Sequence, residues 1–125
     1  MRLHFYAALL MMALLAGCSS LVPSPAPTLT PLESRGRTVF ETYCSRCHGT
    51  SGETVIVGPS LAGIATHGSA RIEGMDAATY IRNSIENPIA YTVDGFPEGL
   101  MPPDLKDQLS QEELDALIAY LLTLE

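Results

Sequence analysis

The chain has 125 residues, which is enough for one domain with a modest core and too few for a large multidomain catalyst. Seven Lys and Arg residues against 14 Asp and Glu residues give a formal net charge of -7, which argues against a mainly electrostatic grip on nucleic acid. Three cysteines, Cys18, Cys44 and Cys47, are an odd number, so each sulfur needs a role other than a simple disulfide framework.

The first 17 residues have the pattern of an export signal. Arg2 precedes an apolar run over 7–16, about half of the roughly 20 residues that a membrane-spanning helix needs. The sequence Leu15-Ala16-Gly17-Cys18 closely resembles the bacterial lipoprotein box, in which the cysteine becomes the acylated first residue. We therefore expect a lipoprotein signal peptide over 1–17 and a lipid anchor on Cys18. The alternative is a plain secretory signal with an incidental cysteine.

Residues 18–30 are expected to form a tether between the lipid and a folded domain over 31–125. The segment is rich in Ser, Thr and Pro and carries no charge, a composition typical of extended linkers. Such an anchor places the domain on the extracytoplasmic, periplasmic side of a cell membrane or an outer membrane. Ser19, after the acylated cysteine, would permit transport to an outer membrane in a host that has one.

The folded domain is predicted to begin with a helix that runs to about Tyr43. Thr30 and Glu33 have the spacing of a capping box, in which each side chain accepts a hydrogen bond from the other residue's backbone. Gly36, Phe40 and Tyr43 then share one face at helical spacing.

Two further helices are predicted from similar patterns. Asp76 is placed to cap a helix over 77–86, which Asn87 and Pro88 would end. Ser110 and Glu113 repeat the capping box before a continuous apolar stripe over 114–122. No alternating strand pattern of useful length is present, so the sequence predicts an all-α fold.

The segments 49–74 and 88–110 are expected to be loops, because both are rich in Gly and Pro. Within the first, residues 54–57 have the composition of a short extended piece. Loops of this length in a small helical domain normally pack against something large. The sequence therefore suggests that a bound group completes the core.

Cys44 and Cys47 belong to the sequence Cys-Ser-Arg-Cys-His, the C-x-x-C-H pattern of covalent attachment of c-type haem. Two thiols three residues apart can each add to one vinyl group of the porphyrin, and the adjacent His48 can then bind the iron. A thioredoxin-like redox pair would need a strand–helix context that the chain lacks. A zinc site would have His67 as its remaining candidate ligand, which makes a poor fourth position. We expect one haem c, bound through both cysteines.

From about Pro31 to its C-terminus the chain resembles a class I mono-haem cytochrome c. Gly36 resembles the glycine that lets the terminal helices cross closely in that family, and Tyr120 resembles the aromatic residue of the partner helix. Gly58-Pro59 resembles the family's Gly-Pro-x-Leu segment. The resemblance implies three or more helices and long loops around one covalently bound haem. It also implies that the Pro59 carbonyl accepts a hydrogen bond from the proximal imidazole and orients it.

The second axial ligand is expected to be Met101, because the family places its methionine ligand in a similar Met-Pro context. Met101 lies between Gly99-Leu100 and Pro102-Pro103, a loop that cannot become a helix. His67 is the rival ligand. With His48 and Met101 both bound, the iron has no open position, and one-electron transfer is the chemistry that remains. The alternatives are a haem subunit whose iron can open for ligand binding, sensing or catalysis, and a structural subunit of a larger complex.

Candidate residues for the apolar lining of the haem site come from the predicted helices and the loops between them: Phe40, Val57, Leu61, Ile64, Ile81, Ile85, Ile89, Phe96, Leu100 and Leu105. Arg82, Asn87 and Tyr91 are candidates for hydrogen bonds to the haem propionates. The chain has no Trp, so the indole that bonds a propionate in many members of the family is missing.

The segments 80–88, 95–97 and 101–102 further resemble the cytochrome c domain fused to subunit II of caa3-type oxidases. They also resemble the small lipoprotein cytochrome of alternative complex III. The resemblance implies an electron carrier or a subunit rather than an enzyme in its own right, with a quinol-oxidising complex, a terminal oxidase or a reaction centre as redox partner. Lys106 is the one lysine, so docking should depend on apolar contact or on a basic partner.

Overall fold

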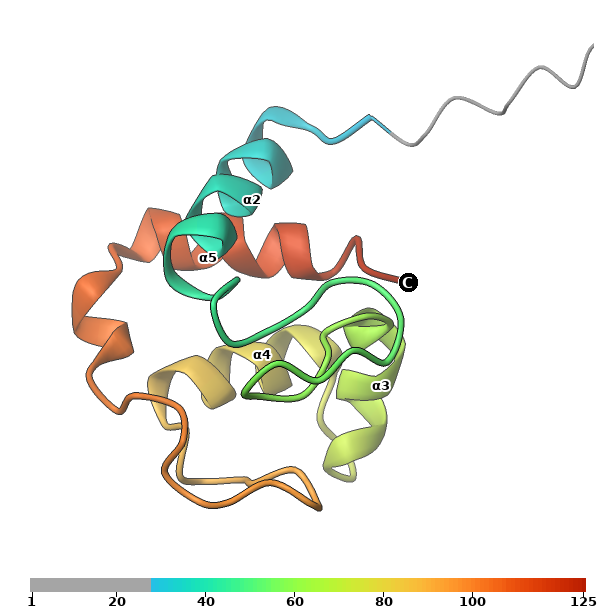
Figure 1. The fold of residues 1–125 in the computed structure, drawn as a ribbon. Coiled ribbons are helices and arrows are strands. Elements are labelled where there is room, and N and C mark those ends of the chain that lie inside the picture. Colours follow the sequence, from blue (N-terminus) through green and yellow to red (C-terminus); the bar gives the residue numbers. More distant parts are fainter. Residues whose placement is uncertain (1–27) are drawn as a thin grey trace, which may run out of the picture.

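The computed structural model describes residues 28–125, in which helices are joined by two long loops (Figure 1). Its elements are α2 (Pro31–Tyr43), α3 (Ile64–Arg71), α4 (Ala77–Glu86), the short 3-10 helix η1 (Leu105–Gln108) and α5 (Gln111–Leu121). Within that range the only β pairing is an isolated bridge between His48 and Val55, at the expected extended piece. The all-α prediction is confirmed. The predicted signal peptide, Cys18 and most of the tether lie outside the described residues.

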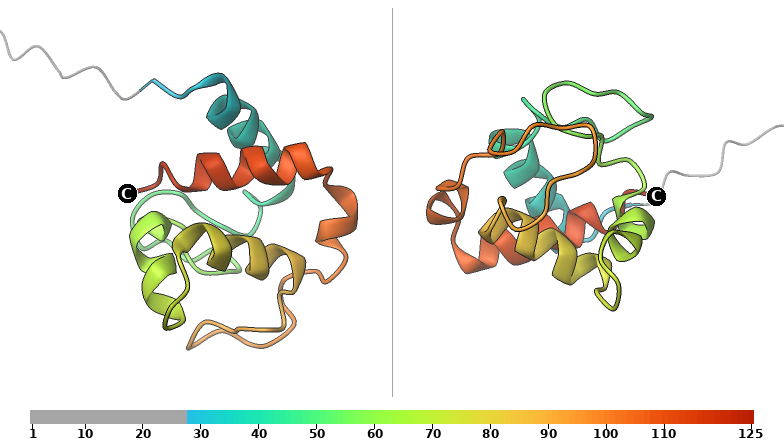
Figure 2. Two further views of the ribbon diagram at one scale, coloured as in Figure 1. Left: turned by 180° about the vertical axis from the view of Figure 1, so that it is seen from behind. Right: turned by 90° about the horizontal axis from the view of Figure 1, so that it is seen from below.

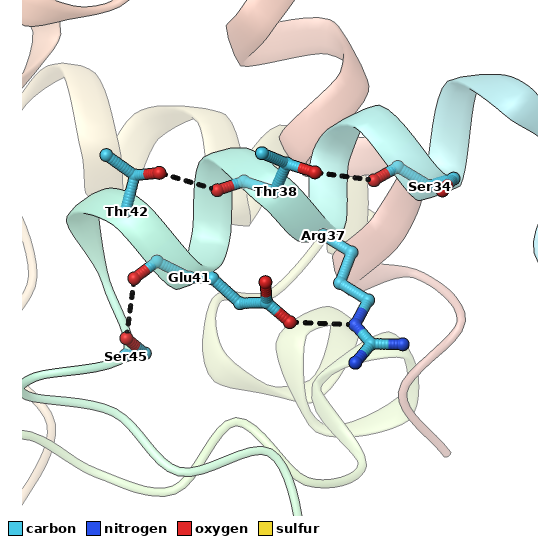
Figure 3. Close-up of polar contacts among 6 residues, drawn as sticks. All are labelled: Ser34, Arg37, Thr38, Glu41, Thr42 and Ser45. Carbon is cyan, nitrogen blue, oxygen red and sulfur yellow. Dashed lines mark hydrogen bonds and ion pairs between the residues drawn. The ribbon is translucent and has the colours of Figure 1, made fainter.

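Helix α2 begins as its sequence predicts. Thr30 and Glu33 form both bonds of the capping box, with 2.6 Å between the Thr30 nitrogen and Glu33 Oε2. The hydroxyls of Thr38 and Thr42 on its exposed face, and of Ser45 just after its end, each donate to a backbone carbonyl four residues earlier (Figure 3). This polar face leaves the opposite face of α2 for packing.

The core is built on the crossing of α2 and α5, which Figure 1 shows near the top of the molecule. Gly36 is buried where the helices meet, and a Cβ there would collide with the backbone oxygen of Ala116 and lie 2.8 Å from Tyr120 Cβ. Beside this contact the rings of Phe40 and Tyr120 pack with 5.8 Å between centroids. The close approach therefore requires glycine at position 36.

Helix α3 corrects the prediction of a continuous loop over 49–74. Its start has no side-chain cap, since Gly63 occupies that position at a φ of 71°, and it contains Gly68, which disfavours an isolated helix. Packing against the core and against α4 stabilises this helix in place of a side-chain cap. Ile64 is buried in the core, and Gly68 lies so close to α4 that a Cβ on it would be 3.3 Å from Ala77 Cα. The helix η1 likewise interrupts the predicted loop over 88–110.

Helices α4 and α5 match their predicted positions. The Asp76 carboxylate accepts a 2.7 Å hydrogen bond from the Thr79 N–H, and Ser110 with Glu113 forms the second capping box. Arg82 of α4 and Asp115 of α5 form an ion pair that ties the two helices together at the surface. Among residues 28–125, no helix combines the length and the apolar character needed to cross a membrane.

Candidate haem-binding site

A large cavity opens between the helices and the two long loops. It contains about 1340 Å³ of space between atoms, part of it open to solvent. One wall is formed by apolar side chains of α4 and α5, namely Ile81, Ile85, Leu117 and Leu121. In the right-hand view of Figure 2, the green loop after α2 and the orange loop after α4 lie on the same side of the molecule, away from α4. These two loops supply most of the remaining lining.

The C-x-x-C-H segment is a turn that follows directly from α2. Cys44 ends the helix, and its carbonyl accepts hydrogen bonds from the N–H groups of Cys47 and His48, each at 3.0 Å. All three residues line the cavity. The helix end therefore presents two sulfurs and one imidazole to the same space.

His48 is oriented by its contact with Pro59. Nδ1 of the ring lies 2.8 Å from the Pro59 carbonyl oxygen. A carbonyl only accepts, so Nδ1 carries the proton and Nε2 is left with the lone pair that a metal can bind. Gly58 makes room for this arrangement, because a Cβ there would lie 2.5 Å from Cε1 of the imidazole.

Burial raises the pKa of the Cys44 thiol to about 11, and the neighbouring Cys47 contributes to the increase. A reactive thioredoxin-type cysteine has a lowered pKa, because its thiolate is the reacting form. The free Cys44 is instead a neutral thiol at physiological pH. Within the described part of the chain, no three His, Cys, Asp or Glu side chains are grouped so as to hold a metal ion.

Met101 lies on the opposite loop and also lines the cavity. Its side chain is partly buried and packs against the hydrophobic core. The rival ligand His67 is exposed on α3, not in a loop as expected, and does not contribute to the cavity wall. Of the two candidate second ligands, only Met101 shares the cavity with His48.

A family model for Cytochrome c matches residues 33–125, which include all but the first two residues of α2 and every later element. The chain belongs to the cytochrome c family. It is also 33% identical, over 112 residues, to cytochrome c oxidase subunit 2 of Alkalihalophilus pseudofirmus. That match covers 87% of this chain but only 30% of the relative's length. Family membership supports electron transfer by a c-type cytochrome, and the helical fold agrees with the expected class I fold.

The residues present in this cytochrome fit a covalently bound haem c. Its cavity lining is largely apolar, as an embedded porphyrin requires, and two thiols stand at the edge of that lining. The fixed tautomer of His48 and the thioether of Met101 are both suitable donors to iron. The assignment of these individual residues stays a prediction.

The predicted lining is largely correct, with two exceptions. Phe40 does not line the cavity, because its ring packs against Tyr120 at the crossing of α2 and α5. Ile89 is 70% exposed and also lies outside the cavity. The other predicted positions do line it: Val57, Leu61, Ile64, Ile81, Ile85, Phe96, Leu100 and Leu105.

The predicted propionate partners need a larger correction. Arg82 is engaged in ion pairs with Asp115 and Glu86 and does not line the cavity, and neither does Asn87. Tyr91 lines it, together with Arg71, which the sequence analysis missed. Arg71 is partly buried, and its guanidinium has no carboxylate within ion-pair distance among residues 28–125. Placing it required helix α3, which brings its last turn to the cavity.

Proposed function

We propose that this cytochrome is a membrane-anchored, mono-haem electron carrier, or the corresponding haem subunit of a respiratory or photosynthetic complex. One observation carries the proposal: His48 and Met101 line the same cavity from opposite loops, with Cys44 and Cys47 beside His48. Bound haem c would supply an iron that gains and loses one electron. The enzyme-like alternative, an iron that opens for ligands, is an outcome of the test below.

The protein's part in this function is to hold the iron ligands and to exclude other ones. Pro59 fixes the tautomer of His48 and strengthens it as a donor. Met101 is held by a loop with two following prolines, so its thioether can be kept at one place. A His/Met pair raises the reduction potential relative to harder ligand sets. The apolar wall favours the less charged ferrous state in the same direction.

A redox titration of the haem-loaded full chain tests this function. We expect one reversible one-electron couple, with no carbon monoxide bound by the reduced protein at neutral pH. Binding of carbon monoxide by the unmodified chain would contradict a closed coordination shell and would favour the openable haem subunit.

The proposed anchor is the lipid on Cys18, followed by the Pro-rich tether over 18–30. It is supported by the lipobox sequence Leu-Ala-Gly-Cys before the tether. The domain would then work on the extracytoplasmic side of a membrane. Replacing residues 1–18 by a cleavable secretory signal should move the cytochrome from the membrane fraction to the soluble fraction without changing its absorption spectrum. A cleaved protein that stays with the membrane would overturn the lipid anchor.

The proposed partners are a quinol-oxidising complex, a terminal oxidase or a reaction centre. The similarity to an oxidase subunit supports a respiratory setting. Gentle solubilisation of membranes distinguishes a fixed subunit from a free carrier, because a fixed subunit copurifies with its complex and a carrier does not.

A further inference from the structure

Three consecutive apolar residues, Val55, Ile56 and Val57, are exposed next to the C-x-x-C-H turn. Their loop is held in place by the backbone. The N–H groups of Val57 and Gly58 donate to the Cys47 carbonyl at 3.2 and 2.9 Å, and Val55 forms the β bridge with His48. The loop is thus fixed with these side chains in solvent.

Two other exposed apolar residues line the same cavity as Val57 of this run. Val57, Tyr43 and Leu100 are all exposed and all line the cavity, from the loop after C-x-x-C-H, the end of α2 and the loop after α4 respectively. We call the combined area the mouth surface: Tyr43, Val55, Ile56, Val57 and Leu100. Contiguous exposed apolar surface on a soluble domain commonly marks a contact with another molecule.

The charge around the mouth surface is acidic. The two loops that border it, 49–61 and 88–104, carry Glu53, Asp94, Glu98 and Asp104, all exposed, and neither loop contains a Lys or Arg. None of these four carboxylates takes part in an ion pair within residues 28–125. Arg46, in the C-x-x-C-H turn, is the exposed base between the two cysteines. The apolar centre therefore has a mainly negative surround.

We propose that the mouth surface is the docking face for a partner protein that presents an apolar patch surrounded by Lys and Arg side chains. The proposal rests on the proposed electron-transfer function and adds the kind of partner. Apolar contact at the centre stabilises the complex, and charge complementarity at the rim speeds encounter and excludes acidic partners.

Electron transfer from the reduced, haem-loaded full chain to two soluble acceptor proteins tests the proposal by stopped flow. One acceptor is a lysine-rich cytochrome c, and the other is an acidic plastocyanin. The rate with the lysine-rich acceptor should fall by about tenfold between low salt and about 0.3 M salt, because salt screens the attraction. The rate with the acidic acceptor should rise. A rate with the lysine-rich acceptor that is flat or rises with salt overturns the proposal.

Two matched pairs of variants locate the effect. Glu98→Lys should lower the low-salt ratio of the lysine-rich to the acidic rate several-fold. Glu73→Lys makes the same charge change on the α3–α4 connection. In the right-hand view of Figure 2 this connection lies at the bottom, whereas the two loops lie at the top. Glu73→Lys should leave the ratio of the two rates nearly unchanged. Taking the ratio removes the effect of a changed reduction potential, which alters both rates in the same direction.

The second pair tests the apolar centre. Ile56 and Leu32 are each 51% exposed, and Leu32 lies in the first turn of α2, at the opposite end of that helix from Cys44. At high salt, Ile56→Ser should slow transfer to the lysine-rich acceptor several-fold, and Leu32→Ser should not. Equal effects within either pair overturn the docking face. A chain that fails to cycle even with small-molecule mediators would instead overturn the proposed function, so the two failures are distinguishable.

Discussion

Gly58 lies against the imidazole of His48, and its missing side chain decides where that ring can sit. In Gly58→Ala the new Cβ would be 2.5 Å from Cε1, so the ring or the loop has to move and the bond to Pro59 is strained or lost. We expect a lower reduction potential and a lower melting temperature, because a less well-oriented imidazole is a poorer donor. Spectra and potentials of the haem-loaded variant measure this.

Gly49→Ala is the matched control, since it adds the same methyl group next to His48 in the chain but meets only Thr54, with the carbonyl oxygen at 3.3 Å and Cβ at 4.0 Å. If both variants keep the parent potential, the packing of Gly58 does not position the ligand.

Arg71 is the cationic side chain that α3 brings to the cavity wall, without a carboxylate partner in the described residues. A positive charge beside the haem favours the ferrous state and can bind a propionate. Arg71→Leu should therefore lower the reduction potential by on the order of tens of millivolts. Arg82→Leu removes an arginine whose partners lie outside the cavity and should shift the potential less. Equal shifts in redox titrations would contradict a role at the haem.

At the scale of helices, the α2–α5 crossing depends on Gly36. Gly36→Ala places a methyl group against the backbone of Ala116, and backbone cannot give way as a side chain can. We expect the free energy of unfolding to fall by about 1–3 kcal/mol or more, as for an overpacked core. Ser34→Ala on the exposed face of the same helix should change it little. Denaturant unfolding of both haem-loaded variants measures the difference, and equal stabilities would contradict the close crossing.

The cap of α5 makes a pH-dependent contribution. Hydrogen bonds from Ser110 lower the pKa of Glu113. A carboxylate with a lower pKa in the folded state stabilises the fold above its unfolded pKa, and this contribution is lost as the pH falls through the folded pKa. Glu113→Gln should therefore reduce stability at neutral pH, and its difference from the parent should shrink below about pH 4. Unfolding by denaturant at a series of pH values measures both.

Glu112→Gln serves as the control for that series. Glu112 lies in the same first turn of α5 but does not form the capping box. A difference that stayed constant with pH for Glu113→Gln would show that the cap bonds do not depend on the charge of the carboxylate.

The three helices with side-chain caps were predictable, because Thr30, Asp76 and Ser110 each satisfy backbone donors that the following helix leaves unpaired. Helix α3 has no such cap and forms through packing against the next helix, α4, and against the core. Local pattern could not reveal it. The position of Arg71 depends on α3, so the same limit explains why that residue was missed.

At the scale of the whole molecule, the sequence could name the C-x-x-C-H turn and the Met-Pro loop but could not show that they face one cavity. That relation depends on how residues 49–61 and 88–104 fold back over α4 and α5. It also places Val57 and Leu100, which lie far apart in the chain, at the same cavity. The proposed function and the proposed docking face both depend on this closure of two loops on one side.

The most direct measurement is the absorption spectrum of the haem-loaded chain beside Met101→Ala and Met75→Ala. Met75 is the other methionine of the described domain, with its sulfur 3.7 Å from Asn83 Nδ2 and outside the large cavity. We predict a far-red sulfur-to-iron band in the oxidised parent and in Met75→Ala. The band should be lost in Met101→Ala, which should also bind carbon monoxide when reduced. A band that survives in Met101→Ala, or is absent from the parent, would contradict His48/Met101 ligation. It would favour His67 as the second ligand or an iron with an open position.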